Sequence, residues 1–201
     1  AMDSVVASTD GCIAIGKDAL GGTQSTNACN RNTAIGYQTM AGNANNMLDN
    51  IAIGYNAMND MTTGDKNIAI GNYALDAEQD GSDNIAIGYN AMTTSNQTNA
   101  IRNVAVGNYA LEDLTGATES NTAVGYEAGM NITTGEYNSC FGKAAGVTIQ
   151  TGGSNICIGQ SADVSAEDSS KRIVIGQVSS NASSDDKIYI GDNTNYLSYA
   201  Y

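Results

Sequence analysis

The sequence predicts an all-β fold, a parallel β-solenoid of about 11 coils. A motif of the type N-I-A-I-G recurs from one end of the chain to the other. Its glycines follow one another at intervals of 15 to 20 residues, and the variation in length falls in polar stretches such as Thr62-Thr63-Gly64-Asp65. Such stretches are expected to be surface loops between fixed strands. Because the repeat fills residues 1–201, we expect a single domain.

Each repeat is expected to contain a strand of four to five residues, a glycine corner with positive φ, a shorter second strand and a loop. The Ile and Val content favours strands over helices, and the last coils are atypical. The repeat glycines are Gly16, Gly36, Gly54, Gly71, Gly88, Gly107, Gly125, Gly142, Gly159, Gly176 and Gly191.

The residue before each glycine is always large and apolar, and we expect it to point into the coil. Side chains along a strand alternate between its two faces, so one face of every strand should build a continuous core. This predicted core consists of Ile15, Ile35, Ile53, Ile70, Ile87, Val106, Val124, Phe141, Ile158, Ile175 and Ile190.

The residue between the two large ones is expected to face outward, where alanine is unusual. Seven consecutive alanines occupy this position: Ala14, Ala34, Ala52, Ala69, Ala86, Ala105 and Ala123. A uniform row of small residues would allow another surface to approach closely, which predicts a homotrimer with this row at the interface. Cys140, Cys157, Val174 and Tyr189 continue the row, so we expect the chains to separate, or the coil to widen, in the last units.

Two further residue types recur at fixed positions. Asparagine stands four residues before most of the glycines, from Asn32 to Asn155, and is expected to form a ladder of hydrogen-bonded amides. Tyr37, Tyr55, Tyr89 and Tyr126 directly follow a glycine, and Tyr73 and Tyr109 come one residue later. These tyrosines are expected at the coil corners, either packed in the trimer or forming an aromatic ligand surface, because their rings are amphipathic.

Composition argues against several classes of function. The net charge of −13 repels nucleic acid and anionic membranes, and no apolar stretch is long enough to predict insertion into a membrane. The chain has no His, so we expect no enzymatic activity and no catalytic residues. The carboxylates of Glu112, Asp113 and Glu119, or of Glu167 and Asp168, would be the acid and base of a polysaccharide-degrading alternative.

No cofactor is expected, with a Ca²⁺ site as the one weak candidate. Asp76, Glu78, Asp80 and Asp83 alternate along one loop that also contains Gly81, a pattern faintly like a calcium loop. Four cysteines occur without a CxxC pair, which favours free thiols over a zinc site. A disulfide joining Cys12 to Cys29, or Cys140 to Cys157, stays open.

The repeats resemble the head repeats of trimeric autotransporter adhesins, the YadA-like head, in which motifs of the S-V-A-I-G type build a trimeric left-handed β-roll. They resemble still more the N-T-A-I-G-Y-x-A-L repeats of phage tail fibres and of surface proteins of large algal viruses, as in the stretches 32–40 and 84–92. The coils here are longer than those of the adhesins.

This resemblance implies a left-handed homotrimeric roll at the surface of a virion. The expected function is a structural or adhesive segment of a tail fibre, acting as a spacer or binding a glycan or protein receptor on the host. The alternative is the head domain of a bacterial trimeric adhesin at the cell surface, and a polysaccharide-degrading tailspike is a third reading.

Overall fold

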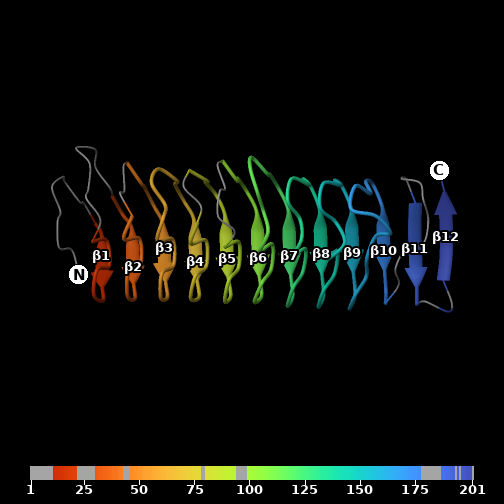
Figure 1. Ribbon diagram of the computed structural model, residues 1–201, viewed down its shortest axis with the longest axis horizontal. Helices are drawn as coiled ribbons and strands as arrows, with labels where there is room; N and C mark the ends of the chain where they lie inside the picture. The colour runs from red at the N-terminus through yellow and green to blue at the C-terminus, as the bar shows by residue number, and fades with distance from the viewer. Residues whose placement is uncertain are drawn as a thin grey trace.

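The computed structural model describes residues 11–21, 30–42, 46–77, 80–93, 99–177, 187–192, 194 and 196–200. One twelve-stranded sheet runs along the molecule with its strands in chain order (Figure 1). The strands are β1 (Ile13–Ile15), β2 (Thr33–Ile35), β3 (Ile51–Ile53), β4 (Ile68–Ile70), β5 (Ile85–Ile87), β6 (Val104–Val106), β7 (Thr122–Val124), β8 (Ser139–Phe141), β9 (Ile156–Ile158), β10 (Ile173–Ile175), β11 (Lys187–Gly191) and β12 (Tyr196–Ala200). In the described part of the chain, no helix is long and apolar enough to cross a membrane.

Strands β1 to β11 pair in parallel and in register, so that equivalent residues of successive motifs lie side by side. This arrangement confirms the predicted parallel β-solenoid. Its eleven parallel strands make about nine turns, fewer than the 11 coils that the sequence predicts. The C-terminal end differs, because β12 reverses direction and pairs antiparallel with β11 (Figure 1). The last strand therefore ends the parallel stacking.

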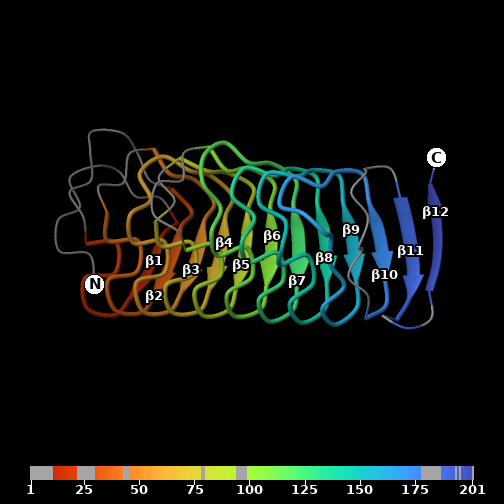
Figure 2. The ribbon, with the colours of Figure 1, turned by 45° about the vertical axis from the view of Figure 1, so that its right-hand side comes forward.

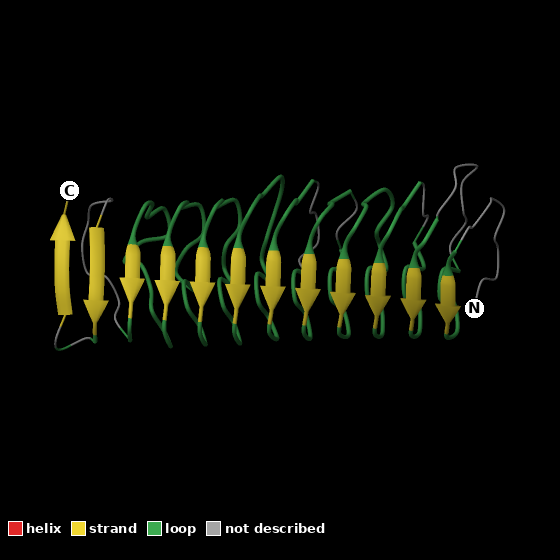
Figure 3. Cartoon of the chain, turned by 180° about the vertical axis from the view of Figure 1, so that it is seen from behind, coloured by secondary structure: helices red, strands yellow, loops and turns green. Residues whose placement is uncertain are grey.

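Each coil contributes one short strand, a tight turn after it and a wider loop that leads to the next strand (Figures 2 and 3). The predicted second strand is absent from the described coils. In the third coil the residues after β3 form a turn, with φ of 146° at Gly54, 54° at Asn56 and 52° at Met58. Residues in the left-handed region reverse the chain direction, whereas a strand needs extended backbone. The turn still stacks on its neighbour, because the Met58 N–H donates to the Ala74 carbonyl at 3.0 Å.

The strands alternate between two faces as predicted, but the assignment of the faces was wrong. The alanines point into the coil: Ala34, Ala52, Ala69, Ala86, Ala105 and Ala123 are fully buried, and Ala14 is partly buried against the same core. The large residues point outward. Exposed members of that set are Ile15, Ile70, Phe141, Ile158 and Ile190, and half-exposed members are Ile35, Ile53, Ile87, Val106, Val124 and Ile175.

The opposite wall of the coil explains why alanine lies inside. A Cβ added to Gly129 would lie 3.6 Å from the Ala123 Cβ, so the residue four after the repeat glycine faces the middle of the strand across the core. In six coils that residue is large and buried: Leu20, Met40, Met58, Leu75, Met92 and Leu111. Because one wall already supplies these side chains, only a methyl group fits opposite them.

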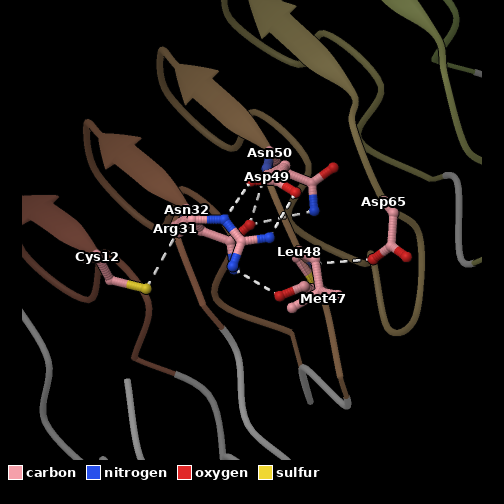
Figure 4. Close-up of polar contacts among 8 residues, drawn as sticks. All are labelled: Cys12, Arg31, Asn32, Met47, Leu48, Asp49, Asn50 and Asp65. Carbon is pink, nitrogen blue, oxygen red and sulfur yellow. Dashed lines mark hydrogen bonds and ion pairs between the residues drawn. The ribbon is translucent and has the colours of Figure 1, made fainter. Parts of the chain in front are cut away.

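The asparagine ladder is confirmed, and its members are fully buried or nearly so. Each side-chain oxygen accepts the backbone N–H of the residue at the same position in the next coil, and each amide nitrogen donates to a loop carbonyl. Asn32 shows the pattern: its Oδ1 accepts from Asn50 N at 2.9 Å and its Nδ2 donates to the Met47 carbonyl at 2.8 Å (Figure 4). The ladder therefore satisfies buried backbone groups along the corner.

Candidate interaction surfaces

The outward side chains of β1 to β10 form a continuous apolar surface, which we call the isoleucine face. Two columns run along it, one from the first residue and one from the third residue of each strand. Ile13 is 50% exposed and Ile15 is 57% exposed, and Ile158 is still 40% exposed near the other end. With strands about 4.8 Å apart, ten strands make a stripe about 45 Å long.

The predicted trimer interface along the alanine row is therefore wrong. Those methyl groups lie inside the chain's own core and cannot touch another subunit. The outward face of the strands consists of large apolar side chains and not of the alanines that the sequence predicts there. The side chains available to another subunit are the large apolar ones that the sequence predicts for the core.

The larger residues that continue the alanine row are also internal. Cys140, Cys157 and Val174 are fully buried, so they indicate neither separation of the chains nor widening of the coil. In the eighth coil the residue opposite Cys140 is Gly146, and a Cβ there would lie 2.4 Å from the Cys140 Sγ. A smaller residue on one wall thus compensates for a larger one on the other. Cys12, Cys140 and Cys157 are free thiols, and Cys29 lies outside the described residues.

A second surface follows the coil corners, where six tyrosines form a continuous row that we call the tyrosine ladder. Neighbouring ring centroids are 5.3 to 6.1 Å apart, stacked for the first pair and edge-to-face for the others. The ladder consists of Tyr37, Tyr55, Tyr73, Tyr89, Tyr109 and Tyr126. The four that directly follow a glycine are exposed, by 38% to 44%, and the other two lie between them and complete the row.

The turn geometry explains how tyrosines at two different sequence positions join one ladder. The two residues after each repeat glycine both belong to the corner, and corner residues of successive coils are joined by backbone hydrogen bonds, such as Tyr73 N to the Tyr55 carbonyl at 2.9 Å. The pKa of Tyr73 is raised, chiefly by desolvation. The pKa of Tyr126 is raised, chiefly by its hydrogen bond with Glu127. These two rings are therefore uncharged at neutral pH.

The acidic loop does not assemble as a calcium site among the described residues, where no three carboxylates, cysteines or histidines are grouped to hold a metal ion. Glu78 lies outside the described residues. Asp80 instead accepts hydrogen bonds from the hydroxyls of Thr62 and Thr63 in the preceding coil. Asp76 is partly buried next to Asp60, and the pKa of its carboxyl is raised to about 6 by desolvation and then by the Asp60 charge. Asp83 lies two residues before β5, where its N–H donates to the Asp65 carbonyl.

The two sets of carboxylates proposed for the enzymatic alternative differ in their surroundings. Glu119 contacts Arg102 and the Tyr137 hydroxyl. Glu112 accepts a hydrogen bond from Asn90 at 3.2 Å, and its pKa is raised, chiefly by desolvation. Glu167 and Asp168 line an open cavity of about 500 Å³ whose other walls are Thr148, Thr151, Ser165 and Ala166. Hydroxyls and carboxylates line this cavity, and residues 165–168, which form much of its wall, are exposed.

No protein-family model, no curated protein and no solved structure matches this chain. The classification of the chain therefore depends on its own repeat and architecture. The in-register strands, the buried asparagine ladder and the stacked glycine corners make the chain a parallel β-solenoid repeat protein.

Proposed function

We propose that this chain is a structural and adhesive rod that assembles as a homotrimer through the isoleucine face, as a segment of a virion fibre. The observation that carries the proposal is the face itself. A stripe made mostly of Ile, Val and Phe side chains spans all ten strands from β1 to β10, and monomeric proteins rarely leave so long a contiguous apolar surface in water.

Sister chains are the natural partners for this surface. Equivalent residues repeat at the coil spacing along both columns, and they are all Ile from β3 to β5, so copies arranged around an axis parallel to the rod would match level by level. Such an arrangement is a closed symmetric assembly. Burying one exposed Ile contributes about 1.5–3 kcal/mol, and many half-exposed residues contribute together. The resemblance to trimeric heads favours three chains and a left-handed winding.

Sedimentation equilibrium tests the assembly. We expect the wild type to sediment as a species of three times the chain mass. The double variant Ile70→Asp/Ile158→Asp places two charges on the isoleucine face and should yield folded monomers. The matched control Ala117→Asp/Ala166→Asp adds two negative charges at exposed loop residues away from the face and should leave the trimer intact. A wild-type chain that sediments as a monomer at micromolar concentration would refute the proposed assembly.

Immunogold labelling of the source material tests whether the rod is located on virus particles. Antibody against the chain should label fibres on virus particles. Labelling of a bacterial outer surface instead would favour the adhesin-head alternative, and would leave the trimeric rod unchanged while overturning its place on a virion.

A further inference from the structure

Six consecutive coil corners share one composition. After each repeat glycine from Gly36 to Gly125 comes a pair made of one tyrosine and one amide or carboxylate residue, in either order. The pairs are Tyr37-Gln38, Tyr55-Asn56, Asn72-Tyr73, Tyr89-Asn90, Asn108-Tyr109 and Tyr126-Glu127. Aromatic rings and hydrogen-bonding groups therefore accompany each other at every level of the ladder.

The amides at two of these corners are held in place and keep a donor for a ligand. Asn72 Oδ1 accepts from Tyr55 N at 3.1 Å, and Asn108 Oδ1 accepts from Tyr89 N at 3.0 Å. Both residues are exposed. Their Nδ2 groups make no hydrogen bond within the described part of the chain, so each amide is oriented by backbone and offers its N–H₂ to solvent. Such fixed donors bind with little loss of side-chain entropy.

We propose that the tyrosine ladder binds a neutral, β-1,4-linked polysaccharide lying along the rod, one sugar to each coil. Pyranose rings present C–H groups on their faces and hydroxyls at their edges, and the ladder presents aromatic rings beside amide donors. A β-1,4-linked chain is a flat ribbon whose sugars succeed one another at a spacing close to the repeat of the coils, about 4.8 Å along the rod. This inference rests on the adhesive part of the proposed function and names its receptor class.

Charge defines the ends of the site and its preference for a neutral ligand. Lys17 lies over the Tyr37 ring, with its Nζ 5.5 Å from the centroid, and Lys143 lies 5.9 Å from the centroid of Tyr126. These two cation–π contacts limit the ladder to six rings. The net charge of −13 and the carboxylate of Glu127 at the last corner repel acidic polysaccharides.

The same composition argues against an apolar protein surface as the occupant. An apolar partner covering the ladder would desolvate the Asn72 and Asn108 amide donors without replacing their hydrogen bonds with water, which is unfavourable. The isoleucine face lies on the strands, whereas the ladder lies on the turns that follow them. The rod thus carries a surface suited to its own copies and another suited to sugars.

Isothermal titration calorimetry with defined hexasaccharides tests the proposal. The probes are cellohexaose, β-1,4-mannohexaose and chitohexaose, and maltohexaose is the matched control because it differs from cellohexaose only in its linkage. We expect at least one β-1,4-linked hexamer to bind at least about tenfold more tightly than maltohexaose, and its disaccharide to bind more weakly than the hexamer. Absence of binding by all three β-1,4-linked hexamers, or equal binding of maltohexaose, would overturn it.

Two sets of variants connect binding to the ladder. Tyr73→Ala/Tyr89→Ala should weaken binding by about tenfold or more, whereas Tyr137→Ala, which removes an exposed tyrosine outside the ladder, should not. Asn72→Asp/Asn108→Asp retains the oxygens that accept from Tyr55 and Tyr89 and replaces the amide donors. It should weaken binding about threefold or more at an unchanged Tm. Binding that survives both double variants would refute the assignment.

Sedimentation of the same samples separates this inference from the proposed assembly. Trimers that bind no sugar would refute the proposed sugar site on the tyrosine ladder and leave the proposed assembly through the isoleucine face unaffected. Monomers that bind sugar through the ladder would refute the proposed assembly and support the sugar site.

Discussion

The repeat glycines meet two requirements at once, which explains why no other residue replaces them. Gly88 has φ of 142°, a conformation that residues with a Cβ rarely adopt. A Cβ added there would also lie 2.4 Å from the Gly107 carbonyl oxygen of the next coil. The same close approach recurs along the stack, so each corner glycine permits the contact between successive coils.

We therefore expect Gly88→Ala to lower the free energy of unfolding by more than about 3 kcal/mol, because backbone strain and a steric clash add. Gly116 is the matched control: its φ is also positive, at 77°, but nothing lies within 4 Å of an added Cβ. Gly116→Ala should cost only about 1 kcal/mol. Denaturant unfolding of both variants measures the difference, and equal losses would contradict this account.

The buried carboxyl of Asp76 predicts a pH dependence of stability. Its pKa is raised from 3.8 to about 6 by desolvation and then by Asp60, and its Oδ1 is buried without a hydrogen-bond partner. Between these values the folded chain binds more protons than the unfolded chain, so this group destabilises the fold as pH rises through that window. The penalty is complete above about pH 6 and absent below about pH 4.

Asp76→Asn should remove this penalty. We expect the variant to be more stable than the wild type by about 1 kcal/mol at about pH 8, after allowance for partial exposure, and equally stable at about pH 3. Asp168→Asn removes a charge from an exposed loop and serves as the control. Thermal unfolding at several pH values measures both, and an Asp76→Asn gain that persists in acid would show that another cause is at work.

The sixth and eighth coils differ in the sizes of the two residues that face each other across the core. The sixth coil combines Ala105 with Leu111 and Leu114, all fully buried. The eighth coil combines Cys140 with Gly146 and Ile149. In the eighth coil the larger residue on the strand is thus matched by a smaller one on the turn, as expected of a densely packed interior. In the seventh coil Ala123 faces Gly129, and the side chains of Leu111 and Ile132 lie beside the glycine.

This complementarity predicts a rescue by a second mutation. Gly146→Leu alone should lower the free energy of unfolding by about 2–3 kcal/mol, because its side chain meets the Cys140 Sγ. In the double variant Gly146→Leu/Cys140→Ala the eighth coil gains the arrangement of the sixth. A double-mutant cycle should give a favourable coupling above about 1 kcal/mol. Strictly additive effects would mean that the two residues do not share a space.

The corner before each strand shows how neighbouring coils are kept in register. Arg31 donates two hydrogen bonds to the Asp49 carboxylate in the next coil, at 2.6 and 2.7 Å (Figure 4). The Arg31 hydrogen bond holds the pKa of Asp49 below its ordinary value. Lys66, Asp83 and Arg102 continue the series with alternating sign. Such exposed pairs add little stability, but a shift by one coil would place like charges together.

At the scale of the whole molecule, the backbone hydrogen bonds between described residues of different coils join neighbouring coils. This is the organisation of a repeat protein, whose stability is a sum of repeat and nearest-neighbour interface contributions. Strand β8 pairs only with β7 and β9. Removing one complete coil should then shorten the rod without disrupting the fold.

Deletion of residues 126–142 joins Gly125 to Lys143 and removes one full repeat of 17 residues. We expect a folded, cooperatively unfolding protein with a lower unfolding free energy, visible by circular dichroism and denaturant titration. Deletion of residues 126–134 breaks the repeat and should abolish the stacking of the following coils. Loss of structure in the first deletion would show that the coils are not interchangeable.

Much of this architecture could be predicted from the sequence by itself. The spacing of Gly36 and Gly54 determines the coils, because only glycine permits the corner contact. The row from Asn32 to Asn155 determines a ladder of buried amides, since each coil offers the same unpaired backbone groups. Tyrosines beside the glycines determine an aromatic edge.

Only the tertiary structure decided which face of the strand lies inside. A segment such as Ile85-Ala86-Ile87 alternates equally well with either residue inward, so the pattern within the strand is ambiguous about direction. The wall opposite resolves it, because buried Met92 and its counterparts leave space for a methyl group and for nothing larger. This volume constraint acts between residues of one coil that meet only after folding, and it turns the isoleucines outward, where they become the surface that needs a partner.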